Sequence, residues 1–239
     1  MYYKYETHCH TSEASLCAYS SAAEMVKAYY DAGYSGIVIT DHFVHGNTAV
    51  DRNLPWEERA KAYYQAYLNA KEAADELDFD VIFGLEHAYG SGKELLCYGV
   101  DLEFLLENPD IPELDVDEFA KRVHNYGGIV IQAHPYRDRF YIDMSVEPRL
   151  DIVDGIEICN SANKIEENVK ALALLEKGDF IATCGSDTHC IDIPKERFAG
   201  IAFPYRIRDG KELVKSLKRR DHIFVIQNEI VTNLSEENL

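Results

Sequence analysis

The sequence has no long apolar run, and it has few basic residues compared with acidic ones. Nowhere in its 239 residues is there a run near the roughly 18 apolar residues that a membrane span needs, so we expect no membrane partner. Lys and Arg number 24 against 42 Asp and Glu, a formal net charge of −18. Because this charge opposes a phosphate backbone, it disfavours extended nucleic acid as a partner.

The sequence also lacks a C-x-x-C pair and a secretory signal. Its N-terminus has no basic segment followed by an apolar one and no small-residue cleavage site, which predicts a cytoplasmic protein. Cysteines spaced without pairs are typical of a reducing compartment, and we expect most of them to be small buried side chains. The six cysteines are Cys9, Cys17, Cys97, Cys159, Cys184 and Cys190.

What the sequence does have is an alternation of short β-branched runs with longer helical patterns. Apolar residues make up 46% of the chain, and the length suits one large domain spanning residues 1–239. The expected strands lie near residues 3–7, 36–40, 81–84, 95–98, 129–133, 155–158, 180–183, 200–203 and 223–226. The expected helices lie near residues 21–32, 55–77, 116–126, 164–177 and 211–218, the first with a Ser21–Glu24 capping box.

This alternation predicts an α/β fold with parallel pairing and right-handed crossovers. The periodicity does not choose between a closed barrel and an open doubly wound sheet. In both architectures, functional residues gather where the carboxyl ends of the strands meet.

Polar motifs follow five of the expected strands. His8 and His10 are two residues apart in an extended segment, so their imidazoles point to the same face and could bind one metal ion. Glu86 ends another strand, where its carboxylate could bridge two cations. The five motifs are His8-Cys-His10, Thr40-Asp-His42, Gly84-Leu-Glu86, Ala133-His-Pro135 and Gly185-Ser-Asp-Thr-His189. Imidazoles mixed with carboxylates favour Zn, Mn or Fe over calcium or an iron–sulfur cluster.

In their order and spacing, these five motifs resemble those of the PHP (polymerase and histidinol phosphatase) family, and the resemblance spans nearly the whole chain. It implies a single domain with a distorted (βα)7 TIM-like barrel and a multinuclear metal site at the carboxyl-terminal face. It also implies metal-dependent phosphoester hydrolysis. The metal ligands it implies are His8, His10, His42, Glu86, His134, Asp187 and His189.

Two positions depart from the family pattern. Family members usually have an Asp or His six to seven residues after the second histidine of the first motif. Here Glu13 follows His10 by three residues and Cys17 by seven, and either could coordinate a metal. Many members also have a histidine shortly after the G-x-E motif, where this chain offers Glu94, which either replaces it or leaves a weaker third site.

Two to three divalent metal ions (Zn, Mn or Fe) would be the catalyst in this reading. Bridging cations lower the pKa of a bound water from 15.7 towards about 7, supply hydroxide and neutralise phosphate oxygens. We expect Glu86, Asp187 and Arg137 to be catalytic, and Arg137 and Arg139 to bind the phosphate because a guanidinium fork matches its edge.

The sequence therefore predicts a metal-dependent phosphatase of the histidinol-phosphatase-like kind, acting on a small phosphomonoester or nucleotide. One alternative is an exonuclease or phosphodiesterase for short oligonucleotides, against which the charge of −18 counts. The other alternative is a catalytically degenerate barrel that binds metal for regulation. The seven ligand-type residues favour activity over this last reading.

Overall fold

The computed structural model describes residues 1–239, with the exception of the side chain of Glu237. It is a mixed α/β fold with one sheet of ten strands, six α-helices and four short 3₁₀ helices. The strands are β1 (Tyr3–Cys9), β2 (Gly36–Ile39), β3 (Asp80–Gly90), β4 (Lys93–Tyr98), β5 (Ile129–Gln132), β6 (Gly155–Asn160), β7 (Ile181–Gly185), β8 (Gly200–Phe203), β9 (Ile223–Ile226) and β10 (Glu229–Val231). The α-helices are α1 (Ala22–Asp31), α2 (Trp56–Ala74), α3 (Leu102–Glu107), α4 (Val116–Tyr126), α5 (Ile165–Leu172) and α6 (Gly210–Arg219), and the 3₁₀ helices are η1 (Ile111–Glu113), η2 (Ala173–Lys177), η3 (Lys195–Arg197) and η4 (Glu236–Asn238).

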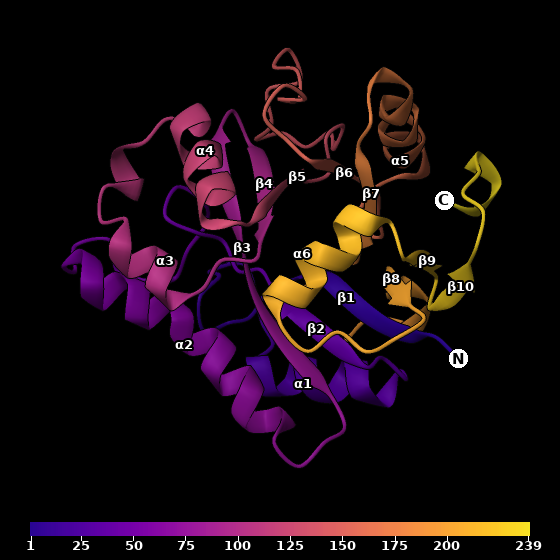
Figure 1. Cartoon of the computed structure of the whole chain (residues 1–239), viewed down its shortest axis with the longest axis horizontal. Coiled ribbons are helices and arrows are strands. Elements are labelled where there is room, and N and C mark those ends of the chain that lie inside the picture. The colour runs from indigo at the N-terminus through magenta and orange to yellow at the C-terminus, as the bar shows by residue number, and fades with distance from the viewer.

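The sheet is strongly curled, so that strands far apart in its order meet (Figure 1). Its order is β10-β9-β8-β1-β2-β3-β4-β5-β6-β7. The loop after β7 nevertheless reaches the end of β1, where Cys9 and Thr188 form a parallel bridge. Two backbone hydrogen bonds fix this junction, from the amide of His10 to Thr188 O at 2.9 Å and from the amide of Asp187 to His8 O at 2.8 Å.

The regular strand–helix alternation is interrupted at β4 and after β8. Strand β4 is antiparallel to both β3 and β5, and β8, β9 and β10 pair antiparallel with their neighbours. The Gly90-Ser91-Gly92 turn joins β3 directly to β4, and all three residues have a positive φ, which makes a tight reversal possible. The apolar pattern of β4 is that of any buried strand and does not indicate the direction of the strand. The turn sets that direction.

Helix α6 closes the end of the sheet where the parallel strands begin. Its Leu213 and Leu217 pack with Tyr5, Ile82 and Tyr98, and all five side chains are buried. The capping box predicted for α1 is confirmed, since the Ser21 side chain accepts from Glu24 N and the Glu24 carboxylate from Ser21 N. Among the described residues, no helix is both long and apolar enough to span a membrane. Helix α6 does not cover the opposite end, where the parallel strands end, so a site can form there.

Candidate metal centre

The strand ends bring the predicted ligand residues together in one buried cluster. Strand β1 supplies two histidines from its end, β3 supplies a glutamate from its middle, and the loops after β2, β5 and β7 supply the rest. All are buried except the last in the chain, which is partly exposed. They are His8, His10, His42, Glu86, His134, Asp187 and His189.

Glu86 lies at the centre of this cluster. Its Oε1 is 3.0 Å from His8 Nε2 and 3.0 Å from His134 Nε2. Its Oε2 is 2.7 Å from His42 Nδ1 and 3.4 Å from His10 Nε2. The two oxygens therefore face different sets of imidazoles, as a carboxylate that bridges two cations must.

Asp187 is a second shared carboxylate. Its Oδ1 is 3.2 Å from His10 Nε2 and 3.5 Å from both His8 Nε2 and His189 Nδ1. Its Oδ2 is 2.5 Å from Arg137 Nη1. One oxygen thus faces the imidazoles, and the other fixes the arginine.

Glu94 also reaches the cluster. Its Oε1 is 3.2 Å from His42 Nδ1, and its Oε2 is 3.4 Å from His134 Nε2. It lies at the start of β4, close to the place where many family members have a histidine. Glu94 therefore places a carboxylate beside His42 and His134, where a ligand that replaces the family's histidine would have to lie.

Two ligand residues have strained backbones. His134 has φ +24° and Asp187 has φ +54°, in the left-handed region that L-residues seldom adopt. Such strain persists only where the surrounding structure imposes it, and it is concentrated at functional sites. Here both residues follow strands, β5 and β7, and turn their side chains into the cluster.

The side chains of the cluster leave some of one another's polar atoms without a hydrogen-bond partner, and a divalent metal would satisfy these atoms. His42 Nδ1 and Glu86 Oε2 are 2.7 Å apart, yet both are buried and neither has a hydrogen-bond partner. The ring nitrogens His8 Nε2 and His10 Nε2 face each other at 3.1 Å. Leaving buried polar atoms unpaired costs about 1–3 kcal/mol each, and a shared cation would satisfy them. Four groups have ligand atoms within 4.8 Å of one another: His10/His42/His189, His8/His10/Asp187, His8/Glu86/His134 and His42/Glu86/Glu94.

Electrostatics keep the two central carboxylates ionised. Burial alone would raise the pKa of Glu86, but His8 and His42 outweigh it and hold that pKa well below its usual range. Burial likewise opposes ionisation of Asp187, and Arg137 together with His8 lowers its pKa well below the usual value. Both side chains therefore offer the anionic oxygens that hard divalent cations prefer.

Buried residues that the sequence analysis did not single out orient the histidines. Glu157 Oε1 lies 2.9 Å from His8 Nδ1. Ser15 Oγ lies 3.1 Å from His10 Nδ1 and donates to Asp41 Oδ1 at 2.7 Å. Such outer contacts fix which ring nitrogen faces a metal. A charged residue inside an apolar strand, as Glu157 is between Ile156 and Ile158, was the signal available in the sequence.

Glu13 and Cys17 are the two candidate ligands that follow the His8-Cys-His10 motif. The structure brings Cys17 to the cluster and places Glu13 elsewhere. Glu13 accepts two hydrogen bonds from the amide of Ala22 at 3.0 and 3.1 Å, so it caps α1. This contact directs the Glu13 carboxylate to the start of α1, and Glu13 is in none of the ligand groups among the described residues. Cys17 instead lines the cavity together with His189 and His42; burial opposes ionisation of its thiol, but the two nearby imidazoles lower its pKa to about 6.

The two predicted phosphate-binding arginines have different environments. Arg137 is buried, donates from Nε to Asn163 Oδ1 at 2.8 Å, and has a buried Nη2 with no hydrogen-bond partner. Arg139 is bound to Glu167 Oε1 at 2.9 Å and to Ala162 O at 3.0 Å, and it does not line the cavity at the cluster. The structure therefore brings Arg137 to the site and leaves Arg139 outside it.

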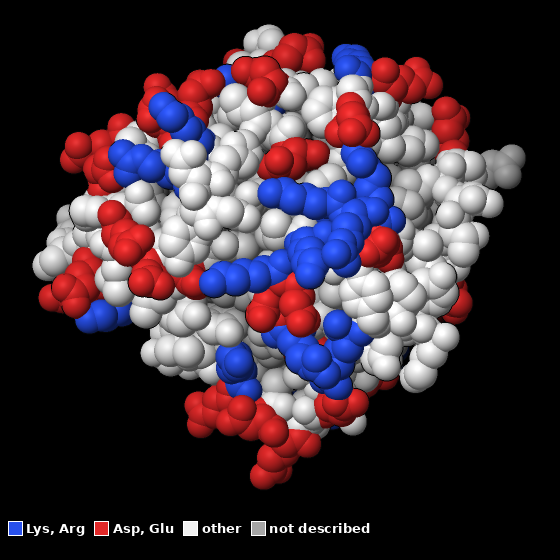
Figure 2. All heavy atoms as spheres, in the orientation of Figure 1, with Lys and Arg blue, Asp and Glu red and all other residues white. Residues whose placement is uncertain are grey.

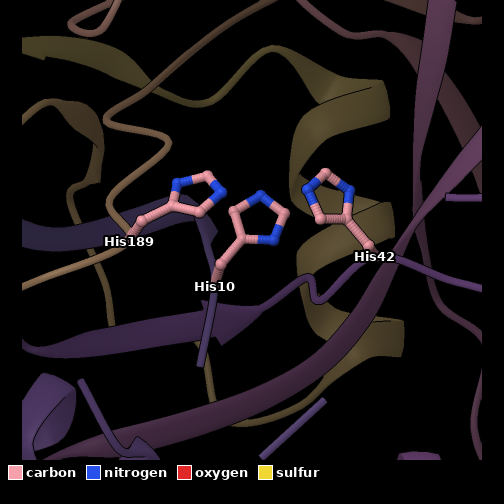
Figure 3. A group of neighbouring side chains, drawn as sticks. All are labelled: His10, His42 and His189. Atoms are coloured by element: carbon pink, nitrogen blue, oxygen red, sulfur yellow. The ribbon is translucent and has the colours of Figure 1, made fainter. Parts of the chain in front are cut away.

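A cavity of about 940 Å³ opens onto the cluster. Arg137 is the one Lys or Arg among the described residues that line it. The histidines at one side lie next to each other, His10 between His189 and His42 (Figure 3), with ring centroids 4.2 and 4.3 Å apart. Its other walls come from the β3–β4 turn, the start of α4 and aromatic side chains that include His45, His87, Tyr89 and Tyr141.

The curled α/β sheet and the His, Glu and Asp cluster at its strand ends define an α/β protein with a candidate metal centre. The PHP domain matches residues 6–158, and the chain belongs to this family. The recognition made from the five motifs is confirmed. Membership implies divalent metals and indicates hydrolase chemistry.

Solved structures share the fold at low sequence identity. A two-domain protein of Bacteroides vulgatus that contains a predicted PHP-like metal-dependent phosphoesterase is 14% identical, with a TM-score of 0.72 over 96% of this chain and 66% of that one. A lesion-specific endonuclease of Pyrococcus furiosus, Endonuclease Q, is 12% identical, with a TM-score of 0.65 over 94% of this chain and 58% of that one. At these identities the likenesses show a shared fold.

A curated relative is similar over part of its length. An uncharacterized protein of Methanocaldococcus jannaschii is 35% identical over 108 residues, which are 42% of this chain. The match spans 46% of that relative, slightly less than half of its length.

Proposed function

We propose that the chain hydrolyses a small phosphoester, a phosphomonoester or nucleotide, with two to three divalent ions of Zn, Mn or Fe. The observation that carries this proposal is the buried Arg137, whose Nη2 has no partner, beside a metal-type cluster in one cavity. An unpaired guanidinium nitrogen is a donor for a phosphate oxygen.

The cluster offers ligands for more than one ion. Glu86, Glu94 and His134 would hold one, and His8, His10 and Asp187 a second, with Glu86 able to join both because its two oxygens face different imidazoles. His42 and His189 would hold a third, together with Cys17. When bound, the metals supply a water that ionises near neutral pH and positive charge for the phosphate oxygens. Glu86 and Asp187 serve this chemistry as the shared ligands.

The residues of the chain position the reactants. Asp187 holds Arg137 Nη1, and Asn163 accepts from its Nε, so Nη2 is the nitrogen left for the substrate. Glu157 and Ser15 fix the rings of His8 and His10 through their Nδ1 atoms. These contacts hold Arg137, His8 and His10 in one arrangement before a substrate binds.

The distribution of charge supports a small substrate over a polymer. Figure 2 shows a band of Lys and Arg over α6, where Lys211, Lys215, Lys218 and Arg219 line a shallow hollow. Helix α6 covers the end where the strands begin, whereas the cavity lies at the other end. A nucleic-acid backbone needs cations along its path, and the cavity offers Arg137 alone among its described lining residues.

Two further parts of the proposal concern architecture and location. We infer that β1–β7 form a distorted seven-strand barrel within a single domain, supported by the bridge between Cys9 and Thr188. A cytoplasmic location is supported by the six cysteines, all free among the described side chains.

A substrate panel tests the proposed activity. Protein reconstituted with Mn²⁺, Zn²⁺ or Fe²⁺ is assayed on phosphomonoesters, on dinucleotides and on duplex DNA with an abasic site, with chelator-treated protein as the blank. We expect metal-dependent release of phosphate from at least one monoester class. Efficient cleavage of dinucleotides or DNA with poor monoester hydrolysis would replace the proposal by a nuclease.

A pair of arginine and lysine variants tests the phosphate contact. Arg137→Ala is expected to lower kcat/KM by roughly 10- to 150-fold, because a hydrogen bond to a charged group contributes about 1.5–3 kcal/mol. Lys215→Gln removes an exposed positive charge on α6 and should leave the kinetics unchanged. Metal content is measured for both. Parent-like kinetics of Arg137→Ala would show that Arg137 does not bind the phosphate.

A further inference from the structure

The cluster differs in donor chemistry from one side to the other. Around Glu86, the groups combine imidazoles with carboxylate oxygens of Glu86, Glu94 and Asp187. At the side of His42 and His189, the group consists of imidazoles, and the thiol that lines the cavity beside them is that of Cys17. The same cavity is lined by Cys17, His42 and His189.

Cys17 lies in a turn that backbone hydrogen bonds hold in place. Leu16 N donates to Asn47 O at 2.9 Å, and Tyr19 N donates to His189 O at 2.8 Å. The turn is therefore tied on one side to the loop after β2 and on the other to the histidine that Cys17 contacts. Because these bonds do not involve the thiol, the backbone positions the sulfur beside the two imidazoles without help from a metal.

The burial of Cys17 differs from that of cysteines that fill the apolar core. Cys17 is half-buried at the cavity wall, unlike Cys9, Cys97 and Cys184, which are fully buried among apolar neighbours. His42 is buried, and its Nδ1 faces Glu86 Oε2 at 2.7 Å and Glu94 Oε1 at 3.2 Å, so this imidazole lies between the carboxylate-rich groups and the group with His10 and His189.

We propose that Cys17, His42 and His189 form a thiolate site that selects Zn²⁺ over Mn²⁺, while the carboxylate-rich groups around Glu86 accept either ion. This inference rests on the metal centre of the proposed function and adds the metal class of one of its sites. Thiolate and imidazole donors favour zinc, whereas carboxylate and water donors suit manganese. On binding, the Cys17 S–H bond loses its proton to solvent and the sulfur lone pair forms the bond to the metal.

Cobalt substitution gives a readout that is independent of activity. A thiolate bound to Co²⁺ produces an intense near-ultraviolet charge-transfer band that oxygen and nitrogen ligands do not produce. We expect this band in the Co²⁺-loaded parent and its loss in Cys17→Ser. Cys190→Ser is the matched control, because Cys190 is also half-buried and follows His189 but does not line the cavity, and it should keep the band.

Metal competition tests the selectivity. In the parent, zinc should displace manganese from one site per chain at a lower zinc concentration than from the other sites. Cys17→Asp, which offers a carboxylate at the same position, should keep the ion count and reduce the zinc preference of that site by at least roughly 10-fold. Thermal melting of the metal-free variants checks that each is folded.

The outcomes separate this inference from the proposed function. A charge-transfer band that needs Cys17 supports the thiolate site even if no phosphoester in the panel is cleaved. Absence of the band in fully Co²⁺-loaded parent, or a band that survives Cys17→Ser, would overturn the thiolate site while leaving phosphoester hydrolysis intact.

Discussion

The two ends of the curled sheet differ in how their buried side chains are satisfied. Where the strands begin, α6 places Leu213 and Leu217 against apolar neighbours. The buried hydroxyls there have partners, since Tyr5 donates to Asp80 Oδ2 at 3.0 Å and Tyr98 donates to Thr7 O at 2.8 Å. This end is organised as ordinary close packing.

At the other end, the same strands bury groups that the protein leaves unsatisfied. Strand β1 runs from Tyr5 in the packed end to His8 at the cluster, and β3 runs from Ile82 to Glu86. Buried atoms of Glu86 and His42 have no hydrogen-bond partner there. One end of each strand therefore stabilises the fold. The other end buries polar atoms without hydrogen-bond partners, a free-energy cost that a bound cation would offset.

Glu86→Gln should have the largest effect and act only on the metal end. The amide presents one neutral oxygen where a bridge needs two anionic ones. We expect kcat/KM to fall by more than about 100-fold, the upper figure for outer-shell partners of a metal. The variant should still fold without metal but with a lower melting temperature, because His8 and His42 lose the negative charge that they stabilise. Kinetics and melting are compared with Glu57→Gln, an exposed residue of α2; near-normal turnover of Glu86→Gln would end the bridging role.

Leu217→Ala should act only on the packed end. Removing buried methylene and methyl groups from a core leucine costs about 2–5 kcal/mol in free energy of unfolding, measured by urea denaturation. Metal ions per folded chain should not change. Leu68→Ala, a partly exposed leucine of α2, is the control and should cost less than about 1 kcal/mol. Loss of metal in folded Leu217→Ala would show that the two ends are coupled.

Glu157→Gln should give the smallest change, and it tests whether Glu157 orients the ring of His8. It keeps the shape of the side chain but removes the negative charge that faces His8 Nδ1. We expect metal affinity to fall by about 10- to 100-fold with the fold retained, measured by competition with a chelating dye. Glu176→Gln, on an exposed part of η2, should bind metal as the parent does. Unchanged affinity of Glu157→Gln would contradict the orienting role.

The sequence indicated which candidate ligand residues would lie together, because short-range geometry and the direction of the strands govern their positions. Residues two apart at a strand end share a face, and carboxyl ends of parallel strands converge, so His8, His10 and Glu86 could be placed together without coordinates. The alternation of strands and helices predicted most elements; α4 lies at the expected residues 116–126.

Contacts that depend on long-range packing were not predictable from the sequence. The choice between Glu13 and Cys17 depends on a turn whose hydrogen bonds reach Asn47 and His189, far along the chain. Glu157 faces His8 from a strand 149 residues away. The direction of β4 depends on a glycine turn, which overrides the parallel pairing that the alternation favoured.

The most direct test of the account is the number of metal ions that the chain binds. Protein purified without chelator, then reconstituted and freed of excess metal, is analysed for elemental content against protein concentration. The four overlapping ligand groups, two of which share Glu86, predict two to three ions per chain. Glu86→Gln measured in parallel should hold fewer ions than the parent. One ion per chain or fewer in the parent would contradict a multinuclear centre.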